Sequence, residues 1–249
     1  MLHSFLLIGQ SNMAGRGYPG EVEPIVNPQV RMLRNGRFIE MFVPVNPDRS
    51  FSGVCLGESF ADAYANEQQV FTGLIPCADG GTTLEQWSEG SVLFDHACYQ
   101  AELASRSSEI KGILWHQGES DCSEALYPTY GERLSAMIDA LRRRLGLGDV
   151  PFIMGGLGDF LAKGTYSPEL ANYRHVNEAM MQLASAKKNC GFVSAAGLAS
   201  NPDELHFSAA ALREFGMRYY REFKRVAAPQ GACNDRGSSV TELSAMERL

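Results

Sequence analysis

Short apolar segments alternate with longer amphipathic segments along most of the chain. Each short segment is typical of a strand that is buried on both faces of a parallel sheet. The predicted strands are residues 5–8, 70–76, 112–115, 151–155 and 191–194. The predicted helices are residues 57–69, 94–109, 127–145, 168–187 and about 208–225. This alternation predicts an α/β fold, a three-layer α/β/α sandwich around a five-stranded parallel sheet.

Residues 16–51 interrupt the alternation after the first predicted strand. Asn35 and Gly36 lie between two stretches of alternating residues, and this pair is the strongest short signal for a β-hairpin, here over residues 30–41. We therefore expect an inserted loop that carries a small hairpin. Near the other end the chain turns polar, which predicts one domain over residues 1–226 and a polar tail over residues 227–249.

Composition and charge narrow the classes of protein to which the chain can belong. The chain has 249 residues, of which 45% are hydrophobic, so it can bury a sizeable core. Its net charge is −7 and it has no run rich in lysine and arginine. These features argue against nucleic acid and against anionic membranes as partners. No apolar run approaches the roughly 20 residues of a membrane-spanning helix.

The apolar run at residues 5–8 has no cationic stretch before it, which is unlike a signal peptide. We expect a cytoplasmic protein, or a secreted one if a leader precedes these residues. The six cysteines form no C-x-x-C pair and are widely spread, so neither a metal cluster nor a disulfide framework is expected. Most of them are expected to be small buried side chains.

Polar clusters follow the predicted strands, and ligands of an open parallel sheet bind beyond the carboxyl ends of its strands. Residues 9–15 (GQSNMAG) place Ser11 in a glycine-bounded turn, where its hydroxyl could attack a substrate or cap a helix. Residues 78–83 (ADGGTT) contain paired glycines, which suit either close approach to a ligand or a plain turn. Residues 115–121 (WHQGESD) hold more polar groups than packing alone explains.

A fourth cluster pairs a carboxylate with an imidazole before the last predicted helix. Asp203 lies three residues before His206, and on a turn this spacing lets the carboxylate reach the ring. The same stretch also suits helix capping by Asp203 or Ser208. Each cluster alone is a weak signal. Together they supply a nucleophile, a base, an orienting acid and amide donors at one edge of one sheet, which favours nucleophilic catalysis.

These four clusters, in this order, resemble the sequence blocks of the SGNH-type carbohydrate esterases. The chain is most similar to the sialate O-acetylesterase domain family, which is related to the acetylxylan esterases of carbohydrate esterase family 6. The resemblance spans about residues 2–225. It implies an SGNH-hydrolase, flavodoxin-like sandwich with a five-stranded parallel sheet. It also implies a serine esterase that removes O-acetyl groups from carbohydrates and requires no metal or cofactor.

The resemblance implies a role for three residues of the first and fourth clusters. Ser11 matches the family's nucleophile, and His206 matches the general base that takes its proton. Asp203 matches the acid that orients the base. The order of these residues along the chain, serine, then aspartate, then histidine, agrees with that of the family.

The resemblance also implies an oxyanion hole with three donors. These are the backbone amide of Ser11, a glycine amide of the second cluster and the side-chain amide of Gln117. Gly81 is favoured for the glycine amide, and Gly80 is the alternative. Three further residues are expected to support the loops, the last of them by hydrogen bonding: Gln10, Asn12 and Glu119.

Acetylxylan and O-acetylated sialic acid are the two substrates that the resemblance implies. Trp87, Trp115 and Tyr18 could stack on a sugar ring or pack in the core. Arg16 and Arg174 could bind a carboxylate such as that of sialic acid, or they could remain solvated surface charges. The sequence leaves the oligomeric state open.

Two other functions stay open at this point. A lipase-like or thioesterase-like hydrolase of the same fold would act on esters without a sugar, and a broad apolar lid, which the sequence lacks, would favour it. A non-catalytic carbohydrate-binding module would keep the fold without the chemistry. The intact set of Ser11, Asp203 and His206 argues against such a module.

Overall fold

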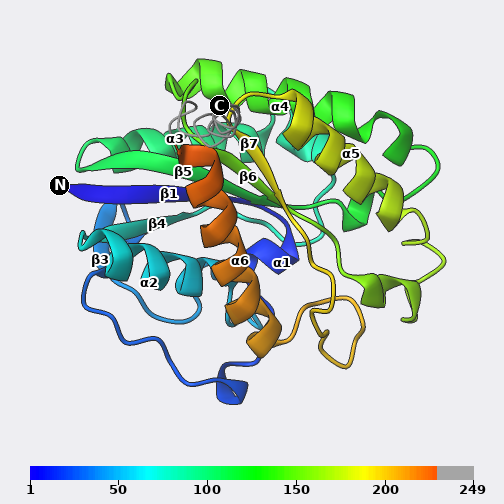
Figure 1. Ribbon diagram of the computed structural model, residues 1–249, viewed down its shortest axis with the longest axis horizontal. Coiled ribbons are helices and arrows are strands. Elements are labelled where there is room, and N and C mark those ends of the chain that lie inside the picture. The colour runs from blue at the N-terminus through cyan, green and yellow to red at the C-terminus, as the bar shows by residue number, and fades with distance from the viewer. Residues whose placement is uncertain (229–249) are drawn as a thin grey trace, which may run out of the picture.

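The computed structural model describes residues 1–228, which form one sheet with helices on both faces (Figure 1). The five apolar segments are strands and run parallel, as expected. Their bounds are β1 (Leu2–Gly9), β4 (Thr72–Pro76), β5 (Ser108–His116), β6 (Phe152–Gly155) and β7 (Cys190–Val193). Residues 5–8 are fully buried because β1 lies in the middle of the sheet, between β4 and β5. The α/β/α sandwich is confirmed.

The sheet has seven strands and not the expected five, because the hairpin joins its edge. The order across the sheet is β3-β2-β4-β1-β5-β6-β7. Strand β2 (Val30–Arg34) pairs parallel with β4, and β3 (Arg37–Glu40) pairs antiparallel with β2. Asn35 and Gly36 form the turn between them, with φ angles of 50° and 74°. The hairpin itself was therefore predicted, but its addition to the main sheet was not.

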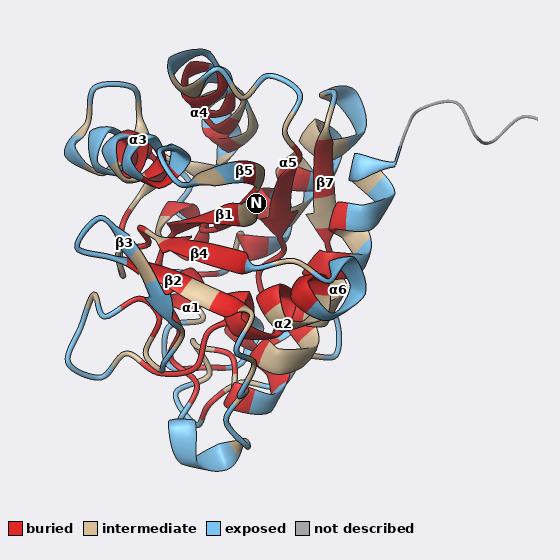
Figure 2. Ribbon diagram, turned by 90° about the vertical axis from the view of Figure 1, so that its left-hand side faces the viewer, coloured by how far each residue is buried: buried red, intermediate tan, exposed pale blue. Residues whose placement is uncertain are grey.

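Helices α2 and α6 cover one face of the sheet, while α3, α4 and α5 cover the other (Figures 1 and 2). The bounds are α1 (Ser11–Ala14), α2 (Leu56–Gln68), α3 (Val92–Ser105), α4 (Tyr130–Leu145), α5 (Tyr173–Ala186) and α6 (Ala209–Ala227). Short 3-10 helices are η1 (Pro19–Glu21), η2 (Leu84–Trp87), η3 (Glu119–Asp121), η4 (Tyr127–Thr129) and η5 (Asp159–Ala162). Buried residues, red in Figure 2, gather where the helices meet the sheet.

Two predicted helices are shorter than expected. Helix α3 ends at Ser105, and residues 108 and 109 belong to β5, where they pair with the start of β1. Helix α5 begins at Tyr173 and not at residue 168, because most of the preceding segment forms turns. The helical pattern of the sequence thus extends past the observed end of α3 and begins before the observed start of α5.

Other expectations concern the tail, the cysteines and the membrane. All of the predicted tail except residues 227 and 228 lies outside the described residues. Five cysteines are buried free thiols, at positions 55, 77, 98, 122 and 190, and Cys233 lies outside the described residues. Within residues 1–228, no helix combines the length and the hydropathy that a bilayer crossing requires.

The strand order also predicts where a ligand binds. Without the hairpin, the five strands β4, β1, β5, β6 and β7 have the order 2-1-3-4-5 along the chain, which is flavodoxin-like and places the ligand site at the carboxyl ends of β1 and β5. These ends approach closely: a Cβ added to Gly9, which has a φ of 129°, would lie 2.1 Å from the carbonyl oxygen of His116. Only glycine fits there, and the loops after β1 and β5 therefore lie side by side.

Candidate active site

Ser11 begins the short helix α1 directly after β1. The N–H groups of Met13 and Ala14 both donate to the carbonyl oxygen of Gln10, at 2.9 and 3.0 Å. Within residues 1–228 the N–H of Ser11 has no backbone acceptor, because the first N–H groups of a helix have no partner inside it. This turn therefore presents a hydroxyl and a free amide N–H from the same residue.

Asp203 and His206 lie on the turn between β7 and α6. Oδ1 of Asp203 accepts hydrogen bonds from the backbone N–H groups of Leu205 and His206, both at 3.0 Å. Oδ2 of Asp203 accepts from Nδ1–H of His206 at 2.7 Å. One carboxylate oxygen thus holds the backbone of the turn, and the other holds the imidazole ring.

The three side chains form one hydrogen-bonded row. Because a carboxylate only accepts, Nδ1 of His206 carries the proton and Nε2 presents a lone pair. Oγ of Ser11 lies 3.0 Å from Nε2, although 195 residues separate the two. Burial raises the pKa of Asp203, but hydrogen bonds from the ring and backbone of His206 and from the N–H of Leu205 outweigh it, so this pKa lies below its ordinary value. The carboxylate therefore stays charged well into the acid range.

The two glycines of the second cluster are placed differently. The N–H of Gly80 donates to Oδ2 of Asp48 at 2.9 Å and is therefore committed. The N–H of Gly81 has no backbone acceptor within residues 1–228, and a Cβ at this position, where φ is 79°, would meet nothing within 4 Å. Both glycines line the cavity beside Ser11. Of the two, the geometry favours Gly81 as the amide that faces a ligand.

Gln117 is placed differently from the expectation. Its side chain is fully buried, and its Nε2 donates to the carbonyl oxygen of Thr82 at 3.0 Å and to Oδ2 of Asp121 at 2.7 Å. The hydroxyl of Tyr130 faces both oxygens of Gln117, at 2.8 Å from the backbone carbonyl and 3.1 Å from Oε1. Gln117 therefore joins the second cluster to the third and has no N–H left for a substrate. The expected contribution of its amide to the oxyanion hole is wrong.

Asn12 connects the third cluster to the turn that carries His206. Its Nδ2 donates to Oε1 of Glu119 at 2.6 Å and to the carbonyl oxygen of Leu205 at 3.3 Å. Its Oδ1 accepts from the N–H of Phe207 at 3.0 Å. Asn12 thus binds the backbone on both sides of His206, and Glu119 fixes the Asn12 amide. These contacts fit the supporting role that was expected for the two residues.

His116, also in the third cluster, is a core residue. It is fully buried, and its ring lies 5.6 Å, centroid to centroid, from the rings of both Phe207 and Phe215. Its Nε2–H donates to the carbonyl oxygen of Gly156 at 3.2 Å. Burial lowers the pKa of His116, so the ring is held neutral.

Asp48 is a site residue that the sequence analysis missed. It lies in the inserted loop, and its carboxylate accepts two hydrogen bonds from Arg16, at 3.0 and 2.7 Å. It also accepts from Oγ of Ser52 at 2.7 Å and from the N–H of Gly80 at 2.9 Å. Asp48 therefore fixes the loop that carries Gly80 and Gly81 by binding the backbone of Gly80. Nothing in the periodicity of this loop marks one acidic residue as buried.

We expect Asp48→Asn to lower the free energy of unfolding by about 3–5 kcal/mol at neutral pH, because Arg16 is then buried without a counter-charge. Burial raises the pKa of Asp48, but hydrogen bonds from Arg16 and Ser52 outweigh it, so this pKa is lowered in the folded state. The contribution of the carboxylate is therefore present above its ordinary pKa of about 4 and is lost as the pH falls through the lowered value. Urea unfolding between pH 3 and pH 7 measures both effects.

Asp149→Asn is the matched control for this experiment. Asp149 pairs with Lys188, but its side chain is 91% exposed. An exposed pair contributes little to stability, so this variant should unfold like the parent. Equal losses in the two variants, or a loss for Asp48→Asn that does not shrink in acid, would contradict the role of the buried pair.

A cavity of about 420 Å³ lies beside Ser11 and His206. Its aromatic side chains are not the expected ones: Trp87 and Trp115 are buried and pack edge to face at 5.7 Å. Tyr18 is half exposed but lies outside the cavity lining. Phe51 and Tyr166, which are 68% and 49% exposed, do line the cavity. Exposed aromatic rings at a cavity mouth indicate a ligand-binding surface.

The two arginines considered for a substrate carboxylate do not offer a free charge to the cavity. Arg16 is 5% exposed and paired with Asp48, so it is neither solvated nor available. Arg174 is exposed, donates to the hydroxyl of Tyr173 at 3.0 Å, and lies outside the cavity lining. Neither expectation for Arg16 was right.

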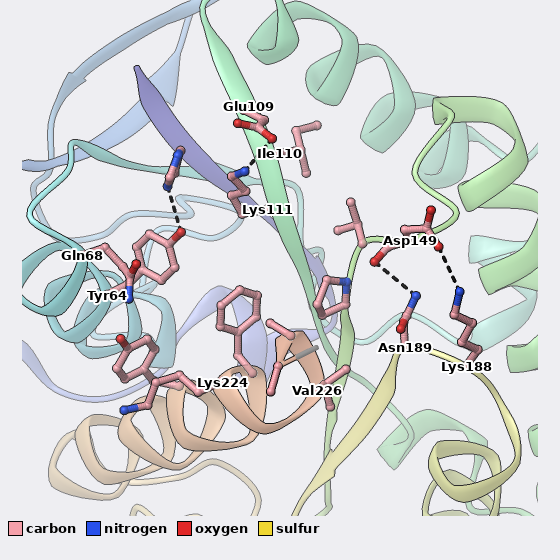
Figure 3. Close-up of a pocket in the computed structure, with 17 residues that line it drawn as sticks. Tyr64, Gln68, Glu109, Ile110, Lys111, Asp149, Lys188, Asn189, Lys224 and Val226 are labelled. Carbon is pink, nitrogen blue, oxygen red and sulfur yellow. Dashed lines mark hydrogen bonds and ion pairs between the residues drawn. The ribbon is translucent and has the colours of Figure 1, made fainter. Parts of the chain in front are cut away.

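A larger cavity, of about 860 Å³, lies at the opposite edge of the sheet, beside the start of β5 and the end of α6 (Figure 3). Its charged side chains are paired: Lys111 with Glu109 and Lys188 with Asp149 within the lining, and Lys224 with Glu67 outside it. Because these groups satisfy each other and the serine–histidine pair lies at the other edge, the smaller cavity is the candidate active site.

Comparison with known proteins decides the family. Residues 1–225 match the family described as carbohydrate esterase, sialic acid-specific acetylesterase. The chain belongs to this family. A probable carbohydrate esterase of Arabidopsis thaliana is 31% identical to this chain over an alignment of 236 residues, and the match covers 86% of each of the two chains. The resemblance drawn from the four clusters is thus confirmed, and the protein is a carboxylic ester hydrolase.

Solved structures agree with the fold of the esterase. A structure of the Arabidopsis thaliana protein has a TM-score of 0.81 at 30% identity and covers 91% of the esterase and 99% of that chain. The structure of NanS has a TM-score of 0.73 at 16% identity, covering 90% and 97%. A carbohydrate acetylesterase from Xanthomonas citri has a TM-score of 0.67 at 21% identity, covering 90% of the esterase and 56% of its own chain. At the lower identities the likeness concerns the fold.

Proposed function

We propose that the esterase releases acetate from O-acetylated carbohydrates through an acyl-enzyme on Ser11. The observation that carries the proposal is the row formed by Oγ of Ser11, the His206 ring and the Asp203 carboxylate, with contacts of 3.0 and 2.7 Å. Ser11 and His206 both line the cavity of about 420 Å³, a volume within the usual range for small-ligand sites. A nucleophile, a base and an orienting acid in mutual contact suit acyl transfer.

The reaction proceeds in two steps. Nε2 of His206 takes the proton of Ser11 as Oγ attacks the acetyl carbonyl carbon, and the free N–H groups of Ser11 and Gly81 stabilise the resulting oxyanion. The bond to the sugar oxygen then breaks, and that oxygen receives the proton from His206. A water molecule, deprotonated by the same nitrogen, attacks the carbonyl carbon of the acyl-enzyme. The bond to Oγ then breaks, acetate leaves, and His206 returns the proton to Oγ of Ser11. Asp203 keeps Nδ1 protonated throughout and stabilises the imidazolium.

The charges of the cavity favour a neutral sugar over a sialic acid. Arg16 is paired with Asp48, and Arg49 donates to Asp79 at 2.8 Å and to the carbonyl oxygen of Gly80 at 3.0 Å. Carboxylates of Glu119 and Glu169 also line the cavity. A substrate carboxylate would therefore meet no unpaired cation among the described lining residues. Acetylated xylan is the first candidate, and O-acetylated sialic acid is the second.

Phe51 and Tyr166 suit a carbohydrate. The guanidinium of Arg16 lies 5.2 Å from the centroid of the Phe51 ring, which anchors that ring on the cavity wall. An anchored aromatic face gives the apolar face of a sugar a contact area at little cost in side-chain entropy. Long acyl chains would need a broader apolar surface than these two separate rings provide.

Covalent labelling tests the role of Ser11. Treatment with an organophosphate or a sulfonyl fluoride should abolish esterase activity and add one label to the peptide that contains Ser11, as measured by mass spectrometry. The variant Ser11→Ala should take up no label there. Inactivation with the label on any other serine would reject the acyl-enzyme proposed here.

A substrate panel tests the class of ester. Acetate release should be fastest from acetylated xylan, slower from O-acetylated sialic acid, and weakest from long-chain p-nitrophenyl esters. A preference for long-chain esters would support a lipase-like enzyme. A preference for O-acetylated sialic acid would contradict the inference that the cavity has no unpaired cation for a substrate carboxylate. Absence of any hydrolysis above that of Ser11→Ala would leave a carbohydrate-binding module as the better description.

A further inference from the structure

The two atoms of the Gln10 side-chain amide differ in their hydrogen bonding: the oxygen has protein partners and the nitrogen, within residues 1–228, has none. Its Oε1 accepts hydrogen bonds from the backbone N–H groups of Gly118 and Ser120, each at 3.4 Å. Because both partners are donors, the amide oxygen must face them and the Nε2 end must face away. Within residues 1–228, Nε2 donates to no protein acceptor, and it is not among the fully buried unpaired atoms.

The unused N–H of Gln10 lies beside the nucleophile. Gln10 is only 3% exposed, and it lines the same cavity as Ser11 and Gly81. Because Nε2 has no protein partner and keeps some exposure in a residue that lines the cavity, it is available to an acceptor that a ligand supplies. The ligand that the cavity would hold is an acetyl ester, and the acceptor that such a ligand brings is a carbonyl oxygen.

Gln117 cannot take this role, because its two N–H groups donate to Thr82 and Asp121. The N–H of Gly80 is committed to Asp48. The backbone amides of Ser11 and Gly81 remain free of backbone acceptors in the described chain. A side-chain N–H donor is thus missing from the expected set, and Gln10, which directly precedes Ser11 and lines the same cavity, has one to offer.

We propose that Nε2–H of Gln10 is the side-chain donor of the oxyanion hole and binds the acetyl carbonyl oxygen as it becomes negative. This inference rests on the proposed acyl-enzyme function. The two backbone N–H groups that hold Oε1 belong to the start of η3 and to the residue before it, so they fix the amide before the substrate arrives. Such a fixed donor stabilises a developing charge without reorganisation.

Two substitutions separate donation from loop support. Gln10→Glu keeps an oxygen for the N–H groups of Gly118 and Ser120 and removes Nε2–H. Gln10→Met removes both functions and adds no charge. We expect each variant to lower kcat for p-nitrophenyl acetate by about 100- to 1,000-fold, with little change in KM. Each should lose affinity for a boronic acid that forms a tetrahedral adduct with Ser11, to a similar extent.

Gln117→Leu is the comparison variant. We expect it to lower the melting temperature through its buried hydrogen bonds, and to lower kcat less than either substitution of Gln10. Circular dichroism checks that each protein is folded. If Gln10→Glu does not fold, Gln10→Met supports the inference only if kcat and boronic acid affinity fall while the melting temperature stays near that of the parent. A loss of kcat that comes with a clearly lower melting temperature would then overturn the inference.

The outcomes are distinct. Near-parental kcat in Gln10→Glu, with a loss only in Gln10→Met, would mean that the side chain merely supports the loop and would overturn the inference. Near-parental kcat in both, or a larger loss of boronic acid affinity in Gln117→Leu, would also overturn it. Full activity of Ser11→Ala would instead reject the acyl-enzyme function on which the inference rests.

Discussion

Ser11→Ala should reduce kcat for acetyl ester hydrolysis by about a million-fold, because comparable triads lose about that much when the nucleophile is removed. His206→Ala should cost nearly the same. In the structure the hydroxyl and the imidazole are 3.0 Å apart, and neither acts without the other. The double variant should therefore be hardly slower than either single variant. Steady-state acetate release over long incubations measures these rates.

The control for the Ser11 experiment is Ser208→Ala. Ser208 lies near the site but only caps α6, by accepting from the N–H of Ala211 at 3.3 Å. Its loss should reduce stability by about 1 kcal/mol and kcat far less than Ser11→Ala does. If the losses from Ser11→Ala and His206→Ala multiply in the double variant, the two side chains act independently, and the proposed mechanism is wrong.

Asp203→Asn should lower kcat by about 10,000-fold while leaving KM largely unchanged. The carboxylate accepts from Nδ1–H of His206 at 2.7 Å, and an asparagine amide that donates there would favour the tautomer with the proton on Nε2. That tautomer cannot take a proton from Ser11. Kinetics with p-nitrophenyl acetate, together with the ring-nitrogen NMR signals of His206, measure the effect and its cause.

Glu204→Gln provides a matched neutralisation on the same turn. Glu204 adjoins Asp203, is partly buried, and lies outside the cavity lining. Its neutralisation should change kcat much less than that of Asp203. Similar losses in the two variants would show that the negative charge of the turn matters, and not the hydrogen bond to the ring.

The sequence was informative wherever position along the chain determines position in space. The residues that follow parallel strands gather at one edge of the sheet, so the meeting of Ser11, after β1, with His206, after β7, could be expected. The apolar segments likewise identified the five parallel strands. The hairpin was marked by Asn35 and Gly36, whose positive φ angles suit its turn.

The errors concern features that tertiary contacts decide: which way a side chain faces, and which strand a hairpin joins. Gln117 follows a strand as Ser11 does, but its amide points into the core between Thr82 and Asp121. Asp48 and Phe51 lie in an irregular loop without periodicity, so nothing in the sequence distinguishes the buried carboxylate from the exposed ring. The addition of β2 to the sheet depends on the open edge of β4, which local pattern does not report.

The long separation between nucleophile and base also affects how activity develops during synthesis and refolding. Ser11 and His206 lie at opposite ends of the domain in sequence, and the turn with the base docks through Asn12 onto the first loop. A chain that lacks the segment after β7 retains its hydroxyl but cannot deprotonate it. Hydrolysis should therefore begin only after the last helix has packed, and a single protease cut before residue 203 that releases this segment should silence the enzyme completely.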